Sequence, residues 1–317
     1  MENKLMVGGQ AVIEGVMMRG PGLVATAVRD PSGKIVVRTK PVSSIGDRYP
    51  VLKKPLLRGV VSLVESLVLG IRSLSYSAQM AGEEDEQLSD KELAGTIIFA
   101  LCMAVVLFVA IPTGAAKFFH TITEDPVFLN LMEGALRLGI FLAYIWGISR
   151  MKDIRRVFQY HGAEHKTIHA YEAGLPLTVE NVQKFSTLHP RCGTAFLLIV
   201  MLVSIVVFAF LGWPDLWLRI LSRVVLLPVV AGISYEIIRF SGRSKNSFVH
   251  MATLPGLWLQ KITTNQPDDD MVEVAIESLK AVLPAEQILE GSGNYLPAAE
   301  PRTIESDQAI AAAQVNS

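Results

Sequence analysis

The chain has little cysteine, little charge and almost no excess of charge of either sign. Its 317 residues include 2 cysteines, 29 basic and 30 acidic side chains, and the formal net charge is −1. Cys102 lies inside an apolar run and Cys192 at the edge of another, so we predict no disulfide. A chain without a basic excess attracts no phosphate backbone, so we expect no nucleic-acid partner. The first residues, MENKLMVGG, contain no apolar core, so we expect no secretory signal peptide.

Half of the sequence is hydrophobic, and the apolar residues are concentrated in long runs. Such runs are typical of helices that cross a bilayer, because these helices satisfy their backbone hydrogen bonds internally. The sequence therefore predicts an α-helical integral membrane protein whose partner is the lipid bilayer. About four spans are expected, at Ala94–Ala115, Gly134–Ser149, Thr194–Gly212 and Trp217–Phe240. The spans contain few charged residues, which disfavours a transporter.

Basic residues predict the orientation of this transmembrane domain, 94–240, because Lys and Arg near a span stay on the cytoplasmic side. The histidine-rich loop 150–193, between the second and third spans, holds seven basic and four acidic residues. The loop 117–133 holds one basic and three acidic residues. We therefore expect a multi-pass protein of the cytoplasmic (inner) membrane, with the loop 150–193 and both termini in the cytosol.

The segments before the spans have two distinct patterns. Residues 1–55 predict a small β-rich cytosolic cap, because apolar and polar residues alternate on both sides of the turn Asp30–Gly33. Residues 56–79 predict an amphipathic helix at the membrane interface, since its polar residues recur along one stripe. A fifth span over the same residues is the alternative.

The segments after the spans also differ from each other. Residues 241–283 are expected to be a cytosolic helical segment. Within it, the acidic run Asp268–Asp270 precedes apolar residues at helical spacing, which predicts a helix that folds back on the cap or on the histidine-rich loop. Residues 284–317 are rich in Ala, Pro, Glu and Ser without an apolar pattern, so we expect a disordered tail.

Three histidines, His161, His165 and His169, are spaced by four and therefore share one face of a helix. His161 and His169 would lie about 12 Å apart along the axis, too far to share one ion. We expect the metal on His161 and His165, with His169 available for a second role. Glu164 completes an H-x-x-E-H pattern, in which two histidines bind zinc and the glutamate acts as general base on water.

A second cluster, His189-Pro190-Arg191-Cys192, comes directly before a span. Histidine and cysteine are good ligands for a soft metal, and a helix N-terminus favours the thiolate. His161, His165, His189 and Cys192 could form a closed structural site, whereas three of them with water would form a catalytic site. Both arrangements stay open at this point. Arg191 is the expected stabiliser of negative charge that develops on a substrate.

Three glutamates are candidate accessory residues. Glu172 shares the helical stripe of His169. We expect Glu236 to form an ion pair with Arg239, three residues away on the same helix. If the metal takes a carboxylate from another helix, Glu236 is the first choice and Glu14 the second.

The chain resembles the YqhQ-like family of uncharacterised bacterial membrane proteins. The residues that carry this resemblance are GGQAVIEGVMMRGP at 8–21, YHGAEHKTIHAYE at 160–172, HPRCGTAF at 189–196 and PDDDMVEVAI at 267–276. The similarity extends over roughly residues 5–284. It implies a bacterial membrane protein, and the family is described as metal-dependent enzymes.

The leading functional hypothesis is a membrane hydrolase that depends on a divalent metal, with its site at the cytosolic membrane face. Histidine and cysteine ligands indicate that this metal is zinc. The alternative is a non-catalytic scaffold or adaptor whose metal is structural. The two differ in the role of Glu164. An enzyme needs this carboxylate for its reaction, whereas a scaffold does not.

Overall fold

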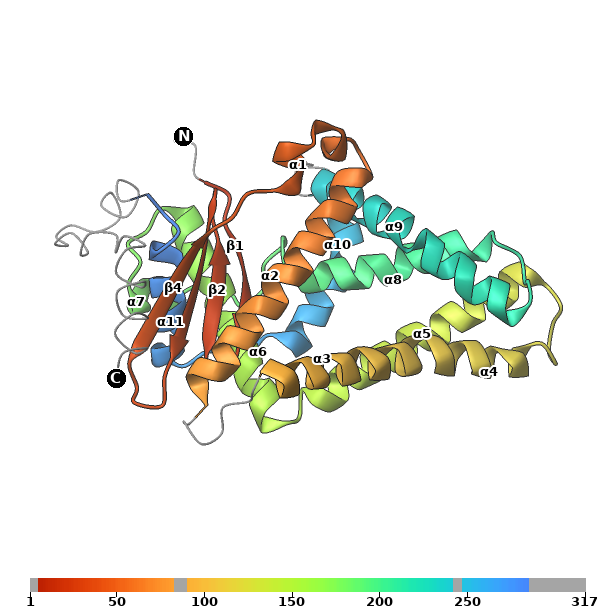
Figure 1. Ribbon diagram of the computed structural model, residues 1–317, viewed down its shortest axis with the longest axis horizontal. Helices are drawn as coiled ribbons and strands as arrows, with labels where there is room; N and C mark the ends of the chain where they lie inside the picture. Colours follow the sequence, from red (N-terminus) through yellow and green to blue (C-terminus); the bar gives the residue numbers. More distant parts are fainter. Residues whose placement is uncertain (1–4, 83–89, 242–246, 285–317) are drawn as a thin grey trace, which may run out of the picture.

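The computed structural model describes residues 5–82, 90–241 and 247–284. The predicted tail lies outside this part of the chain, except for Pro284. A small sheet covered by helices forms one end of the molecule, and a bundle of long helices extends from it (Figure 1). This arrangement confirms the predicted class, a mostly helical protein with a small N-terminal β-sheet.

The sheet is an antiparallel meander in which each strand pairs with the next one in the sequence. Its strands are β1 (Gly8–Val12), β2 (Gly15–Arg19), β3 (Leu23–Arg29) and β4 (Ile35–Pro41). The turn between β3 and β4 begins at Asp30, whose carboxylate accepts from the backbone N–H of Lys34 at 2.9 Å. Gly33 has a φ of +86°, a conformation that glycine adopts without strain. The predicted hairpin is therefore confirmed.

Alternating side chains of the strands pack on two different layers, as the pleat of a strand requires. Val16, Met18 and Ala27 belong to a core shared with α6 (Lys152–Ala173) and α11 (Asp269–Lys280). On the opposite face, Val12, Met17 and Val24 pack together with Leu69. Leu69 lies on α2 (Leu57–Ala81), which crosses this face of the sheet (Figure 1).

The helix α2 is amphipathic, as predicted, and its polar stripe is used for contacts. Arg58 pairs with Glu236 of α9 (Leu216–Ser241), at 2.5 Å between Nη2 and Oε2. Glu65 accepts from the hydroxyl of Ser44 at 2.8 Å and pairs with Arg19. Among the described residues, α2 does not belong to the helices long and apolar enough to span a membrane. The composition of α2 therefore favours the predicted helix outside the spans over the alternative of a fifth span.

Three helical segments of the described chain are long and apolar enough to cross a membrane: Ala94–Ala116, Pro126–Ile148 and Leu216–Phe240. The first combines α3 (Asp90–Val105), a π-helical turn at Val106–Ala110 and α4 (Ile111–Phe119). The second is α5, and the third lies in α9. The chain is a membrane protein by this criterion.

Two of the predicted spans have different bounds in the structure. The third predicted span forms α8 (Gly193–Ala209), whose 17 residues extend about 25 Å, less than the roughly 30 Å of a bilayer core. This helix packs against α5, α9 and α10 (Ser247–Thr263), so it is part of the helical bundle. The second predicted span begins earlier, at Pro126, because the carboxylate of Asp125 caps the backbone N–H groups of residues 127 and 128.

The histidine-rich segment is a helix of 22 residues and not an open loop. It ends at Gly174, which has a left-handed φ of +74°, and the short helix α7 (Val179–Gln183) follows. Residues 160–168 of α6 are buried. The helix α11 packs against both α6 and the sheet, so the predicted fold-back onto the cap and the histidine-rich segment is confirmed.

Candidate metal centre

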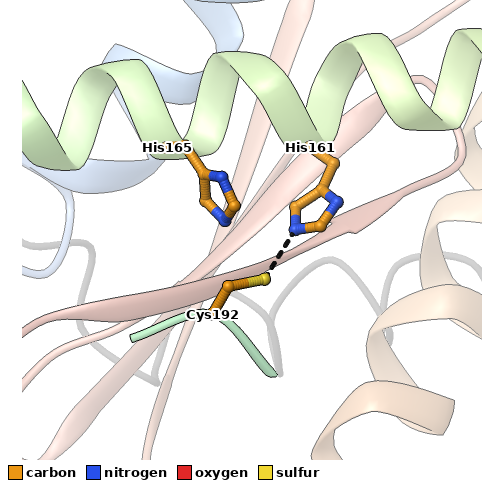
Figure 2. A group of neighbouring side chains, drawn as sticks. All are labelled: His161, His165 and Cys192. Carbon is orange, nitrogen blue, oxygen red and sulfur yellow. Dashed lines mark hydrogen bonds between the residues drawn. The ribbon is translucent and has the colours of Figure 1, made fainter. Parts of the chain in front are cut away.

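The metal-binding candidates come from one face of α6 and from the start of α8. His161 and His165 point from α6 toward Cys192, the residue directly before α8 (Figure 2). One ring nitrogen of each histidine and the Cys192 sulfur lie within 4.8 Å of one another, and all three residues are buried. Nε2 of His161 is 3.1 Å from Sγ of Cys192. We call His161, His165 and Cys192 the first ligand group.

Backbone carbonyls fix how the two histidines of this group carry their protons. Nδ1 of His161 lies 2.8 Å from the carbonyl oxygen of Thr263, and Nδ1 of His165 lies 2.5 Å from that of Thr187. A carbonyl oxygen only accepts, so each Nδ1 must carry a proton, and in the neutral imidazole Nε2 then keeps a lone pair. Metal-binding histidines in proteins are held in the same way.

The unpaired ring nitrogen of His165 suits a metal ion. Nε2 of His165 is buried and has no hydrogen-bond partner among the described residues. A buried polar atom without a partner lowers the stability of the fold unless a ligand binds to it. Two imidazole nitrogens and one sulfur form the N/S donor set that zinc prefers, with a fourth position left for water or substrate.

A close approach of two backbones builds this group. An added Cβ on Gly162 would lie only 2.0 Å from the carbonyl oxygen of Asn265, so only glycine fits there. This contact holds the segment after α10 against α6. It thereby places the carbonyl of Thr263 beside His161.

Cys192 is also the N-cap of α8. Its sulfur accepts from the backbone N–H of Thr194 at 3.4 Å and lies 3.1 Å from the hydroxyl of the same residue. Burial raises the pKa of the Cys192 thiol, so the metal-free residue is protonated. A bound metal ion would deprotonate it, because thiolate is the coordinating form.

Glu164 lies next to the first ligand group on α6. Burial raises its pKa to about 8, while the nearby His161 and a hydrogen bond from the backbone of Gly9 oppose the rise. Its Oε2 atom is buried without a hydrogen-bond partner among the described residues. An added Cβ on Gly9 would lie 2.9 Å from Cγ of Glu164, so β1 passes directly against this carboxylate.

His169, Glu172 and His189 form a second ligand group, whose donor atoms also lie within 4.8 Å of one another. Nε2 of His169 lies 2.9 Å from the carbonyl oxygen of Leu188. The backbone N–H of Arg191 donates to Nδ1 of His189 at 3.3 Å, which leaves the proton of this neutral imidazole on Nε2. Burial lowers the pKa of His189 to about 4, which keeps the ring neutral.

The second ligand group is therefore less suited to a metal than the first. Nε2 of His189 faces Oε2 of Glu172 at 3.6 Å, and Arg191 forms an ion pair with the other oxygen of Glu172. A positive guanidinium beside the carboxylate reduces the attraction of this group for a cation.

The structure thus separates the four ligands that the sequence suggested for one closed site. His161, His165 and Cys192 meet in the first group, while His189 joins His169 in the second. The ring centroids of His165 and His189 are 5.6 Å apart, so the two groups are neighbours. Arg191, the expected stabiliser of a substrate's negative charge, is paired with Glu172 in this structure.

Two of the accessory glutamates lie outside both ligand groups. Glu14 pairs with Arg156 at the start of α6 and accepts from the hydroxyl of Tyr160 at 3.2 Å. Glu236 pairs with Arg58 of α2 and not with Arg239, the partner suggested by its spacing. Both carboxylates therefore connect structural elements.

Sequence reasoning did not find the residues that hold the ligands in place. Thr187, Leu188 and Thr263 act through their backbone carbonyls, which leave no signal in the side-chain pattern. Gln260 does leave one, since it is a polar residue in the apolar stretch 254–260. Its amide exchanges two hydrogen bonds of 2.8 Å with the backbone of His189.

A cavity of about 490 Å³ lies beside β1, on the side of the sheet that faces α2. It is lined mostly by apolar atoms, and its lining includes Met6, Gly8–Gln10, Met17, Arg19 and Leu69. Because Gly9 lines the cavity and also contacts Glu164, one strand separates the cavity from the candidate centre.

These features define a membrane protein in which a buried N/S ligand group joins a small sheet to a helical bundle. The chain belongs to the family described as "Protein of unknown function (DUF1385)", which matches residues 54–285. It is similar to the "Uncharacterized protein YqhQ" of Bacillus subtilis (strain 168), with 38% identity over 298 residues that cover 89% of this chain and 94% of the relative. The resemblance seen in the sequence is thereby confirmed. No solved structure matches the chain.

Proposed function

We propose that this protein is a zinc-dependent hydrolase with a mononuclear centre at His161, His165 and Cys192. One observation carries the proposal. The Nδ1 atoms of both histidines donate to backbone carbonyls, so that two Nε2 lone pairs converge with a sulfur beside a buried, unpartnered carboxylate oxygen. Three protein ligands with an open position are typical of catalytic zinc, whereas structural zinc takes four.

When bound, zinc would supply a Lewis acid that lowers the pKa of water at the open position to about 7. Oε2 of Glu164 would accept a proton from the attacking water, because it is the free acceptor next to the ligands. Nearby positive charge lowers the pKa of a carboxyl group, so Glu164 would be ionised in the loaded protein. The oxygen of water would bond to the substrate, the bond to the leaving group would break, and Glu164 would return its proton to that group.

The membrane placement is part of the same proposal. The centre joins α6, which packs against the sheet, to the start of α8, which packs against the candidate spans α5 and α9, and the basic residues of 150–193 favour the cytosolic side. A substrate at the boundary between lipid and water fits this location. In this role, α2 lies at the interface, with apolar residues such as Leu67 and Ile71 exposed toward lipid.

An untargeted turnover assay tests the proposal. The zinc-loaded protein in detergent is incubated with a membrane extract from a deletion strain of its native organism. The products are compared by mass spectrometry with those formed by Glu164→Gln. We expect the wild type to deplete at least one species and Glu164→Gln, with equal zinc, to deplete none. If the two spectra are identical, the metal is structural and the scaffold hypothesis replaces the enzyme.

A further inference from the structure

Three arginines and one glutamate form a charged cluster inside the helical bundle. The cluster lies on α5 and α9, whereas the metal centre lies on α6 and at the start of α8. Glu133 and Arg137 belong to α5, and Arg219 and Arg223 belong to α9. Glu133 is 1% exposed, Arg219 is 5% exposed and Arg223 is 7% exposed. Buried charges of this kind need partners, because removing them from water is costly.

The contacts of Glu133 are already complete. Its Oε1 lies 2.8 Å from Nη2 of Arg137, and its Oε2 accepts from Nη2 of Arg223 at 2.7 Å. The hydroxyl of Thr113 also donates to it at 3.0 Å. One carboxylate therefore balances one of three positive charges, and the cluster keeps an excess of two.

The unbalanced charge is most evident at Arg219. Its Nε and Nη1 atoms, and Nε of Arg137, are buried without an acceptor in the part of the chain that the structure describes. The guanidinium of Arg219 lies 4.0 Å from the ring centroid of Trp213, a contact that orients it without neutralising it. The carboxylate of Asp125 is used to cap α5.

The position of the cluster indicates which anion would complete it. Arg219 lies in the first turn of the candidate span Leu216–Phe240, and Trp213 comes just before that span. Arginine and tryptophan at the end of a span lie at the depth of the lipid headgroups. A guanidinium binds phosphate oxygens through paired N–H donors.

We propose that Arg137, Arg219 and Arg223 form a binding site for a phosphate-type anion. The anion is the phosphate of a phospholipid headgroup or free inorganic phosphate, and both present the same oxygens to the free donors of Arg137 and Arg219. The site is independent of the metal centre and of its chemistry.

Thermal unfolding of the full chain in phosphate-free detergent tests this site. Short-chain phosphatidylglycerol, phosphatidylcholine and inorganic phosphate are titrated into the wild type, Arg219→Gln and Arg150→Gln. Arg150 is the matched control, because it also stacks on a tryptophan, at 4.5 Å from the ring of Trp146, but is exposed. Loss of a charged hydrogen-bonding partner should weaken anion binding in Arg219→Gln about tenfold or more, and Arg150→Gln should bind like the wild type.

The three probes distinguish the sources of the anion. Stabilisation by phosphatidylglycerol or phosphatidylcholine without an effect of phosphate identifies a lipid headgroup, and stabilisation by phosphate identifies a free anion. Without any anion, Arg219→Gln should unfold at the same temperature as the wild type or higher, because it removes an uncompensated buried charge. The proposal is overturned if no probe stabilises the wild type, if both variants respond equally, or if Arg219→Gln is less stable without anion. Should Arg219→Gln fail to fold, Arg137→Gln takes its place with the same expectations.

Discussion

Nε2 of His161 lies 3.1 Å from Sγ of Cys192, while the other ring nitrogen of His161 lies 2.8 Å from the carbonyl oxygen of Thr263. The imidazole is thus held between the backbone carbonyl of Thr263 and the sulfur of Cys192, which is 31 residues away in the sequence. This geometry orients a metal ligand before any metal binds, so the group needs little rearrangement on binding.

The division into two ligand groups predicts different effects for histidines on the same helix. His169→Ala should leave the zinc content unchanged, because His169 belongs to the second group, whose carboxylate is paired with Arg191. Cys192→Ser should lower zinc affinity at least about tenfold, because a hydroxyl is a poor substitute for a thiolate. Competition with a zinc-sensitive dye measures both. Equal losses in the two variants would mean that one ion is shared between the groups.

Metal removal should destabilise the folded protein. Zinc that binds only the native state adds about 4 kcal/mol of stability when its free concentration exceeds Kd about a thousandfold. A chelator should therefore lower the unfolding temperature of the wild type and of Glu164→Gln by similar amounts. Scanning fluorimetry in detergent measures this shift. An unfolding temperature that the chelator does not change would contradict a ligand group that binds metal in the native state.

Gly162→Ala should destabilise the fold by about 1–3 kcal/mol, because the new Cβ would overlap the carbonyl of Asn265. The matched control is Gly139→Ala in α5, where an added Cβ meets no atom within 4 Å and alanine is the better helix former. Thermal unfolding of the two variants should separate them. If Gly162→Ala is as stable as Gly139→Ala, the backbones of α6 and the segment after α10 do not touch as described.

The ion pair between Arg58 and Glu236 should couple α2 to α9. Both side chains are 28% exposed, and Arg58 donates to both oxygens of the carboxylate. A double-mutant cycle with Arg58→Gln and Glu236→Gln should give a small favourable coupling free energy, because solvent screens a partly exposed pair. Equilibrium unfolding in detergent measures the four proteins. Strictly additive effects would show that the pair contributes nothing to the docking of α2.

The sequence predicted those parts of the fold that depend on a local pattern. The β3–β4 hairpin follows from the alternating pattern around the turn Asp30–Gly33, and α11 from apolar residues at helical spacing after an acidic run. The stripe of His161 and His165 follows from a spacing of four on one helix. Each of these features is encoded within about twenty consecutive residues.

What the sequence did not predict depends on contacts between distant residues. The span of α5 begins at Pro126 and includes Glu133. A hydropathy pattern excludes a glutamate from a span, but Arg223 of α9 neutralises this one. The bundle consequently contains more buried charge than the apolar runs suggested. Similarly, the assignment of His189 to the second group depends on where Glu172 and the backbone of Arg191 lie in space.

Zinc stoichiometry tests the central claim most directly. Elemental analysis of the protein, purified gently in detergent without chelator, should give about one zinc per chain for the wild type, as expected for a mononuclear centre. The double variant His161→Ala with His165→Ala should contain none, while His169→Ala should keep the wild-type content. A wild-type protein without stoichiometric metal, or a double variant that keeps its zinc, would contradict the metal centre.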